Sequence, residues 1–168
     1  MRLTKGSTNT SHQVIDDFLP QENFKLLKDL MLGKKIPWFY SPDDNSGDFL
    51  FYMTHSFYHS NTPTSSHFNT VYDNLIKFIN IKSLIRVKGN MYPNQKIKKE
   101  NGIHRDEEWE HKGAIFYINT NNGRTLLRND VKINSVANRL LLFNPSLEHD
   151  SENCTDEKVR VNININYF

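Results

Sequence analysis

The sequence predicts a mainly β domain with flanking helices, because its two halves show different patterns. From residue 84 onward, short runs of apolar and β-branched residues alternate with turns rich in Asn, Gly and Pro, and no helical period appears. Many short strands separated in this way favour a sandwich, a barrel or a jelly roll. The candidate strands are residues 84–92, 113–119, 125–127, 131–133, 139–143 and 159–167.

Two amphipathic helices are expected in the N-terminal half. Residues 14–20 lead into the first, whose apolar residues recur at helical spacing, and Gly33 stands at the position of a C-terminal cap. Ser65 or Ser66 is the expected N-cap of the second helix. The apolar faces consist of Phe24, Leu27, Leu30 and Met31 in the first helix, and of Phe68, Val71, Leu75, Phe78 and Ile79 in the second.

An aromatic region separates the two helices. Residues 38–42 and 49–52 are rich in Trp, Phe and Tyr, and the segment 43–48 between them is rich in turn residues. This pattern predicts one or two strands joined by loops. Their aromatic side chains serve the core more readily than a lid over a site.

Length and composition predict one globular domain. A chain of 168 residues can bury one core but not comfortably two. Hydrophobic residues make up 37% and charged residues 24%, which excludes a disordered chain. We therefore expect a single domain over residues 1–168, with N-terminal helical support at about 12–80 and a β-core at about 84–168.

Charge and cysteine content limit the expected partners and compartment. The 21 basic and 19 acidic residues give a net charge of +2, which argues against nucleic acid as a partner. Cys154 is the single cysteine and cannot form an internal disulfide, and the first residues do not resemble a signal peptide. No window reaches the ~18 apolar residues of a membrane span. We expect a reducing, cytoplasmic setting with no membrane partner, and we leave the oligomeric state open.

A set of metal-ligating residue types stands in the β half. His104 and Asp106 are two positions apart, so on extended chain both side chains face the same side. His149 follows the strongest apolar run, 140–143, and is the expected third ligand. Two imidazoles and one carboxylate on one face of iron(II) leave positions open for other ligands. With 7 His in the chain, a His-x-Asp pair arises by chance roughly half the time, so a surface loop pair and an exposed loop histidine stay open as alternatives.

Arg160 adds a second kind of group to this set. It begins a strictly alternating strand in which Asn162, Asn164 and Asn166 share its face. The acidic, turn-like stretch 150–158 can reverse the chain and return Arg160 beside His149. An arginine that faces a cavity requires an anion, and its planar fork suits a carboxylate. A salt bridge from Arg160 to Asp156 or Glu157 is the simpler alternative.

In their order along the chain, these pieces resemble the Fe(II)/2-oxoglutarate oxygenases of the prolyl-4-hydroxylase-like group, particularly small phage-encoded members. The resemblance covers about residues 84–168, with a weaker echo at 14–20. Ordered co-occurrence makes it far more specific than any single motif. The matching pieces are residues 86–93, 104–106, 115–125, 138–143, His149 and Arg160.

The resemblance implies a double-stranded β-helix, similar to jelly-roll and cupin proteins, with a metal at one mouth. By position, His104, Asp106 and His149 would bind Fe(II), and Arg160 would bind the C5 carboxylate of 2-oxoglutarate. Tyr92 and Asn90 would supply further polar contacts to this cosubstrate. O2 is the second cosubstrate, and ascorbate stays open as an additional reductant.

The implied reaction hydroxylates a carbon of a peptide or small-molecule substrate and releases succinate and CO2. A prolyl residue is the leading candidate, and a phage origin would place the protein in the host cytoplasm. Two departures weaken the prolyl assignment: Arg160 stands where collagen-type prolyl hydroxylases usually have lysine, and Asn122 replaces the first glycine of a Gly-Gly-x-Thr pattern. Trp109 would line the substrate pocket, with local packing as its alternative role.

Other functions remain open at this point. One is hydroxylation of a nucleotide or a small metabolite, and another is a non-catalytic cupin-like binding module, which has no need for all four of His104, Asp106, His149 and Arg160. A zinc site at His55, His59 and His67 is disfavoured because it lacks cysteine partners and regular ligand spacing. His12 is expected to be terminal and exposed.

Overall fold

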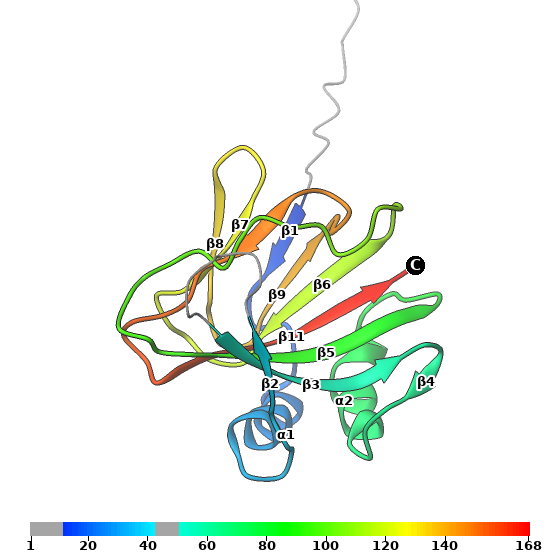
Figure 1. Ribbon diagram of the computed structural model, residues 1–168. Coiled ribbons are helices and arrows are strands. Elements are labelled where there is room, and N and C mark those ends of the chain that lie inside the picture. The colour runs from blue at the N-terminus through cyan, green and yellow to red at the C-terminus, as the bar shows by residue number, and fades with distance from the viewer. Residues whose placement is uncertain (1–11, 43–50) are drawn as a thin grey trace, which may run out of the picture.

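The computed structural model describes residues 12–42 and 51–168, which form two antiparallel sheets and two α-helices (Figure 1). The turn predicted at 43–48, together with Phe49 and Leu50, lies outside these residues. Among the residues described, no helix combines the length and the apolar character needed to cross a membrane.

The larger sheet runs across the whole molecule. Its strands follow the order β1-β9-β6-β11-β5-β3-β2, and β4 pairs with β3 away from this path. Its strands are β1 (His12–Ile15), β2 (Phe39–Pro42), β3 (Phe51–His59), β4 (Thr62–Pro63), β5 (Leu84–Pro93), β6 (Lys112–Tyr117), β9 (Arg139–Phe143) and β11 (Val159–Tyr167).

The smaller sheet consists of β7 (Arg124–Leu127), β8 (Val131–Asn134) and β10 (His149–Ser151), in the order β10-β7-β8. Residues 100–104 run along its free edge, where isolated bridges join Glu100 to Glu152 and His104 to His149. From β5 onward the chain alternates between sheets: β5, then 100–104, then β6, then β7 and β8, then β9, β10 and β11. This alternation is the topology of the double-stranded β-helix, so the predicted fold class is confirmed.

Helices α1 (Gln21–Leu32) and α2 (Phe68–Asn74), with the short 3-10 helix η1 (Ile76–Phe78), cover the face of the large sheet that points away from the small sheet (Figure 1). Leu27 and Met31 of α1 pack there in one cluster with side chains of β5, β6 and β11. A Cβ on Gly89 would lie 2.8 Å from Cε of Met31, so this glycine allows the helix to approach the sheet closely.

A second, smaller core lies between the sheets. It contains Ile115 and Tyr117 of β6, Ile133 of β8, and Leu141 and Phe143 of β9. The inner faces of β5 and β11 carry polar side chains instead. The space between the sheets is therefore apolar on one side and polar on the other, and the polar side can hold a hydrophilic ligand.

Most predicted elements are present, and the differences have local causes. Residues 14–20 do not lead directly into a helix: β1 pairs with β9, and α1 begins only after Pro20. His12 is correspondingly half-buried in β1 and not a free terminal residue. The second helix begins at Phe68, and Leu75 separates α2 from η1. Ser65 accepts a hydrogen bond from His67 N but lies before the cap position. The stretch 150–158 begins as strand β10 before it turns.

Candidate metal and cosubstrate site

Three potential metal ligands converge at the mouth between the sheets. Backbone hydrogen bonds of 3.0 Å run in both directions between His104 and His149, which sets the two imidazoles side by side. Their Nε2 atoms lie 3.8 Å and 3.9 Å from the same Asp106 Oδ1. One ligand atom from each of the three residues falls within 4.8 Å of the others. Among the residues that the structure describes, this is the one group of three or more His, Cys, Asp or Glu with such geometry.

The backbone fixes which nitrogen of each imidazole faces this centre. His104 Nδ1 lies 3.0 Å from Gly102 O, and His149 Nδ1 lies 2.9 Å from Leu147 O. A carbonyl oxygen only accepts hydrogen bonds, so each Nδ1 must carry the proton. Each Nε2 then presents its lone pair to the centre, which is the arrangement that metal-binding histidines commonly adopt.

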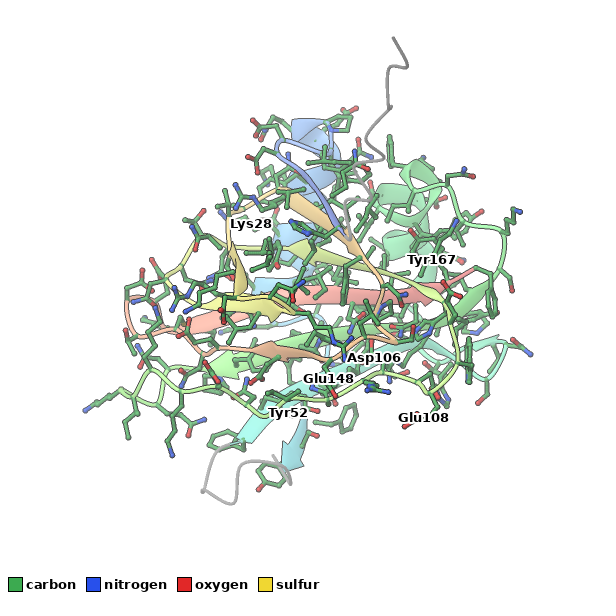
Figure 2. The ribbon with its side chains drawn as sticks, turned by 90° about the horizontal axis from the view of Figure 1, so that it is seen from above. Lys28, Tyr52, Asp106, Glu108, Glu148 and Tyr167 are labelled. Carbon is green, nitrogen blue, oxygen red and sulfur yellow. The ribbon has the colours of Figure 1, made fainter. Side chains whose placement is uncertain are left out.

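Asp106 is held as a buried carboxylate. Its Oδ2 accepts a 2.9 Å hydrogen bond from Asn166 Nδ2, and its Oδ1 lies 3.2 Å from Arg86 Nη2. Burial raises the pKa of Asp106, but Arg86, His149 and the bond from Asn166 outweigh it and bring the pKa below the ordinary value. The side chain points inward whereas Glu108, two residues later, lies at the molecular edge (Figure 2). Asp106 is thus ionised at neutral pH.

His149 has the complementary protonation state. Burial lowers the pKa of His149 and outweighs the opposite influence of the Leu147 carbonyl and of Asp106. The ring of Phe143 meets the imidazole edge-on, with centroids 5.1 Å apart. A neutral imidazole and an ionised carboxylate are the forms that bind a metal. Two imidazoles and one carboxylate fit iron(II) with an open face.

Arg160 is buried beside this centre with 1% of its surface exposed. Its guanidinium donates to three hydroxyl oxygens, those of Ser135 at 2.8 Å, Ser151 at 2.8 Å and Thr125 at 3.0 Å. Its central carbon lies 5.1 Å from the centroid of the Tyr92 ring. Within the described part of the chain it forms no ion pair, so the predicted alternative of a salt bridge to Asp156 or Glu157 is wrong there; Asp156 instead accepts from Asn122 N.

The charge of Arg160 is not balanced by an anionic group among the described residues. A guanidinium has five N–H groups, and three hydroxyl partners leave two of them available. A buried charge without an opposite charge is costly, so the geometry suits a ligand carboxylate. Gly123 makes room for the side chain, because a Cβ there would lie 2.6 Å from Arg160 Cδ.

A cavity of about 310 Å³ is lined by His104 and Asp106 of this centre and by Tyr92 and Ser151, which contact Arg160; His149 and Arg160 themselves are not among its lining residues. Four of its lining residues carry a buried polar atom without a partner: Arg86 Nε, Asn90 Oδ1, Asn101 Nδ2 and Asn164 Oδ1. Unpaired buried polar atoms are rare in folded proteins, and their concentration here indicates a ligand site. The lining residues are Tyr52, Arg86, Lys88, Asn90, Tyr92, Asn101, His104, Arg105, Asp106, Ser151 and Asn164.

Tyr92 and Asn90 both line this cavity, as their shared face on β5 predicts. Asn90 Nδ2 donates to Asn162 Oδ1 at 3.1 Å. The Tyr92 ring stacks on Tyr52 with centroids 5.4 Å apart. Burial raises the pKa of Tyr92 despite the opposing charge of Arg160, so its hydroxyl stays protonated at neutral pH and can donate a hydrogen bond.

Trp109 occupies a different place. Its ring stacks on Phe168 with centroids 5.4 Å apart and contacts His111, and 43% of its surface is exposed. It is not among the residues that line the cavity. Its predicted contact with substrate would therefore be made outside the cavity.

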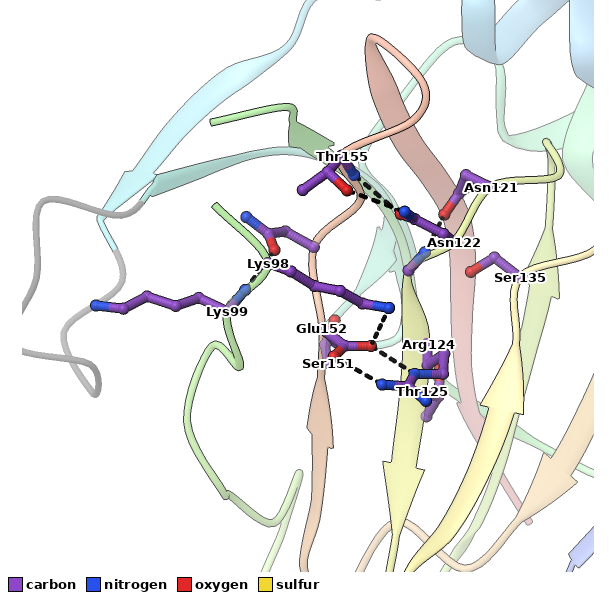
Figure 3. Close-up of polar contacts among 12 residues, drawn as sticks. Lys98, Lys99, Asn121, Asn122, Arg124, Thr125, Ser135, Ser151, Glu152 and Thr155 are labelled. Atoms are coloured by element: carbon purple, nitrogen blue, oxygen red, sulfur yellow. Dashed lines mark hydrogen bonds and ion pairs between the residues drawn. The ribbon is translucent and has the colours of Figure 1, made fainter. Parts of the chain in front are cut away.

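Polar contacts fasten the small sheet around the site. Glu152 lies between Arg124, at 2.6 Å, and Lys98, at 3.5 Å, and so joins β7 to the segment that leads to residue 100 (Figure 3). The side chain of Asn122 bonds to Thr155 in both directions, with both distances 2.9 Å. The asparagine that stands in place of the glycine therefore connects the loop before β7 to the loop before β11.

The structure also brings in residues that were not predicted as part of the site. Ser135, Ser151 and Thr125 hold Arg160, and Arg86 and Lys88 line the cavity. The alternation along β5 could have found Arg86 and Lys88, because both share a face with Asn90 and Tyr92. No sequence signal marks the three hydroxyls, which come from different strands and loops.

The second histidine group does not form a comparable centre. His55 Nδ1 lies 2.8 Å from Pro37 O and its Nε2 lies 2.8 Å from Ser65 Oγ, so both ring nitrogens already have partners. His59 contacts the hydroxyl of Ser60. These are structural hydrogen bonds of the β3 region.

Comparison with solved structures shows which known proteins share this fold. The structural neighbours of the chain are 2OG-Fe(II) oxygenase family members and prolyl hydroxylases, where 2OG is 2-oxoglutarate. Neither a protein-family model nor a curated protein matches the sequence. At the low sequence identities involved, the likeness is one of fold.

Three neighbours illustrate this likeness. An oxidoreductase of the 2OG-Fe(II) oxygenase family from Burkholderia pseudomallei is 8% identical, with a TM-score of 0.70 over 99% of this chain and 93% of that one. A viral collagen prolyl hydroxylase from Paramecium bursaria Chlorella virus-1, in its 2OG complex, is 13% identical, with a TM-score of 0.61 over 95% and 98%. A prolyl hydroxylase from Trichoplax adhaerens, in complex with a hypoxia inducible factor oxygen degradation domain peptide fragment, is 15% identical, with a TM-score of 0.64 over 95% and 84%.

Proposed function

We propose that this chain is an Fe(II)- and 2-oxoglutarate-dependent dioxygenase. The observation that carries the proposal is the convergence of His104, Asp106 and His149, in which both Nε2 atoms lie within 3.9 Å of one carboxylate oxygen and both Nδ1 atoms are bonded to backbone carbonyls. A cupin-like binding module that performs no turnover would need neither this set nor a buried Arg160 beside it.

Arg160 is the proposed partner of the C5 carboxylate of 2-oxoglutarate. The three hydroxyls hold the guanidinium in one orientation and leave N–H groups available for a bidentate contact. Tyr92 and Asn90 line the cavity and offer a hydroxyl and an amide as further contacts to the same molecule.

Bound iron(II) and 2-oxoglutarate would supply the oxidation of a substrate C–H bond by O2, with succinate and CO2 as products. The residues of the chain bind and orient. His104, Asp106 and His149 would hold the metal, and Tyr52 and Tyr92 form the aromatic part of the cavity wall beside it. None of these residues needs to act as a general base.

We further propose a peptide as the substrate, with a prolyl residue as the oxidised group. The likeness of fold to two prolyl hydroxylases, one of them in complex with a peptide, supports this choice. Hydroxylation of a nucleotide or a small metabolite by the same centre is the second candidate, favoured by the cationic groups that line the cavity. Trp109, which does not line this cavity, stays a proposed substrate contact.

The metal and cosubstrate assignments have a direct test. Anaerobic addition of iron(II) and 2-oxoglutarate should produce a weak visible absorption band, and air should then release succinate even without the prime substrate. His149→Ala should lose both signals, because the metal loses one of three ligands. His59→Ala, which removes an exposed histidine, is the matched control and should keep both. If His149→Ala retains both signals, the ligand assignment is wrong.

The substrate class requires a separate measurement. Peptide and metabolite libraries can be incubated with the iron-loaded protein and 2-oxoglutarate, and mass spectrometry can detect products that gain one oxygen atom. A prolyl peptide among these products would support the finer proposal. Oxidation of metabolites alone would favour the second candidate.

A further inference from the structure

The cavity carries more positive charge than the proposed reaction requires. Its lining contains the cationic residues Arg86, Lys88 and Arg105, whereas Asp106 is the one carboxylate among them. Arg105 is already balanced, because its guanidinium lies 3.1 Å from a Glu148 carboxylate oxygen. Arg86 lies 3.2 Å from Asp106 Oδ1, so in this structure the unbalanced charge belongs to Lys88.

Lys88 has no anionic partner within the described residues. Its ammonium nitrogen lies 5.7 Å from the centroid of the Tyr52 ring, and its cross-strand neighbours are Asn164 on β11 and Ser56 on β3. Burial and the neighbouring charge of Arg86 lower the pKa of Lys88 to about 8, against the weaker opposing influence of Asp106. Lys88 is half-buried, and an ammonium partly removed from water with no anionic partner is unfavourable unless a ligand supplies the anion.

Arg86 is in a similar position once a metal is present. Its Nη2 shares Asp106 Oδ1 with the two imidazoles, and its Nε is buried without a partner. A divalent cation at that oxygen would compete for the same carboxylate. Even with dianionic 2-oxoglutarate bound, the positive charges around the cavity would outnumber the negative ones.

We propose that the substrate carries an oxyanion, a carboxylate or a phosphate, close to the carbon that is oxidised, and that Lys88 and Arg86 bind it. This inference rests on the proposed function and adds a substrate class to it: in a peptide the oxyanion would be a neighbouring acidic group or the C-terminal carboxylate, and in a metabolite or nucleotide it would be part of the molecule itself. The site is distinct from that of the C5 carboxylate, because Arg160 pairs across the sheet with Tyr92, whereas Lys88 and Arg86 stand four and six residues before Tyr92 on β5.

The test measures the binding of small anions to protein that cannot turn over. The protein is loaded with Mn(II) in place of iron(II), together with 2-oxoglutarate, and the relaxation of methyl protons is followed as acetate, methylphosphonate or neutral acetamide is added. Bound Mn(II) speeds the relaxation of methyl groups held nearby. We expect both anions to bind and acetamide not to bind. The tighter of the two anions identifies carboxylate or phosphate as the group.

Three variants give this measurement its controls. Lys88→Met should weaken anion binding about tenfold, the effect of losing one charge-assisted hydrogen bond. Lys88→Arg should keep it, and Lys132→Met, which removes an exposed strand lysine elsewhere, should not change it. If Lys88→Met binds the anions as well as the parent protein does, the anions bind to the metal and the inference is wrong. The inference is also wrong if acetamide binds as tightly as the anions.

The same titration separates this inference from the proposed function. Mn(II) alone changes the relaxation of solvent water when it binds, and 2-oxoglutarate changes that signal again. A protein that takes up neither would overturn the proposed function and this inference together. A protein that takes up both but does not distinguish acetate or methylphosphonate from acetamide would overturn this inference alone.

Discussion

The two faces of β11 are both buried, yet they have opposite chemistry. The face toward the helices consists of Val161, Ile163 and Ile165, and the face toward the cavity of Arg160, Asn162, Asn164 and Asn166. Apolar burial lowers the free energy of the folded state, whereas burial of these polar groups raises it unless partners are found. The comparison suggests that one face of the strand stabilises the fold and the other is maintained for ligands. Single substitutions on each face can test this division.

The largest effect on stability is expected on the helix side. Ile163 is fully buried in the core beneath α1, so Ile163→Ala should lower the free energy of unfolding by about 3 kcal/mol. Urea denaturation measures this loss, with Lys132→Ala on exposed strand surface as the control. 2-Oxoglutarate affinity of the folded fraction should stay unchanged. A loss below about 1 kcal/mol would contradict the proposed role of this face.

On the cavity side, Arg160→Met should act on ligand binding. Affinity for 2-oxoglutarate should fall about 100-fold, because the carboxylate loses a buried cationic partner. Without ligand the variant should be as stable as the parent protein or more so, because an unpaired buried charge is removed. Titration of Mn(II)-loaded protein with 2-oxoglutarate measures the affinity, and urea denaturation measures the stability. Arg128→Met, at an exposed ion pair with Glu148, is the control for loss of an arginine. Marked destabilisation of Arg160→Met would assign Arg160 to folding instead.

A smaller effect is expected from Gly123→Ala. The added methyl group would meet Arg160 Cδ at 2.6 Å and the backbone oxygen of Glu152 at 2.8 Å, so both the arginine and the backbone at Glu152 must shift. We expect about a tenfold loss of 2-oxoglutarate affinity, with metal binding retained. In an Arg160→Met background the same substitution should have no further effect on affinity, since the two act through one contact. Additive losses would show that Gly123 acts by another route.

The smallest effect concerns the pH dependence of stability. The pKa of Lys88 is about 8 in the folded protein, below the ordinary value of 10.5. Between these values the unfolded chain holds a proton that the folded protein has released, so stability should rise with pH there. In metal-free protein, the difference in unfolding free energy between the parent and Lys88→Met should be constant below pH 7 and should change from pH 8 to 9.5. A pH-independent difference would show that folding does not lower the pKa of Lys88.

The strand pattern could be predicted from the sequence because it depends on alternation and turn residues. β9 and β11 have the predicted bounds. β10 could not be predicted: it has three residues, two of them charged or ionisable, and its strand character comes from pairing with β7. β1 was missed for the same reason, since its pairing with β9 decides its conformation.

The candidate ligands could be named from the sequence, but their environment could not. The strict alternation after Arg160 placed it correctly on the face of Asn162, and the structure brings it beside Ser151, two residues after His149. The hydroxyls of Ser135 and Thr125 come from distant segments and carry no local signal. The cytoplasmic setting, the phage origin and the use of ascorbate stay predictions.

The edge of the small sheet has a consequence for how a metal would be taken up. His149 belongs to a paired strand, whereas His104 stands on a segment that joins the sheet through two isolated bridges. An ion that binds both imidazoles would act as a cross-link between β10 and that segment. Part of the free energy of metal binding would then order residues 100–104. Metal binding should therefore slow amide hydrogen exchange in this segment, and variants that bind the metal more weakly should show less of this slowing. Substitutions that stiffen this segment would raise affinity without touching a ligand.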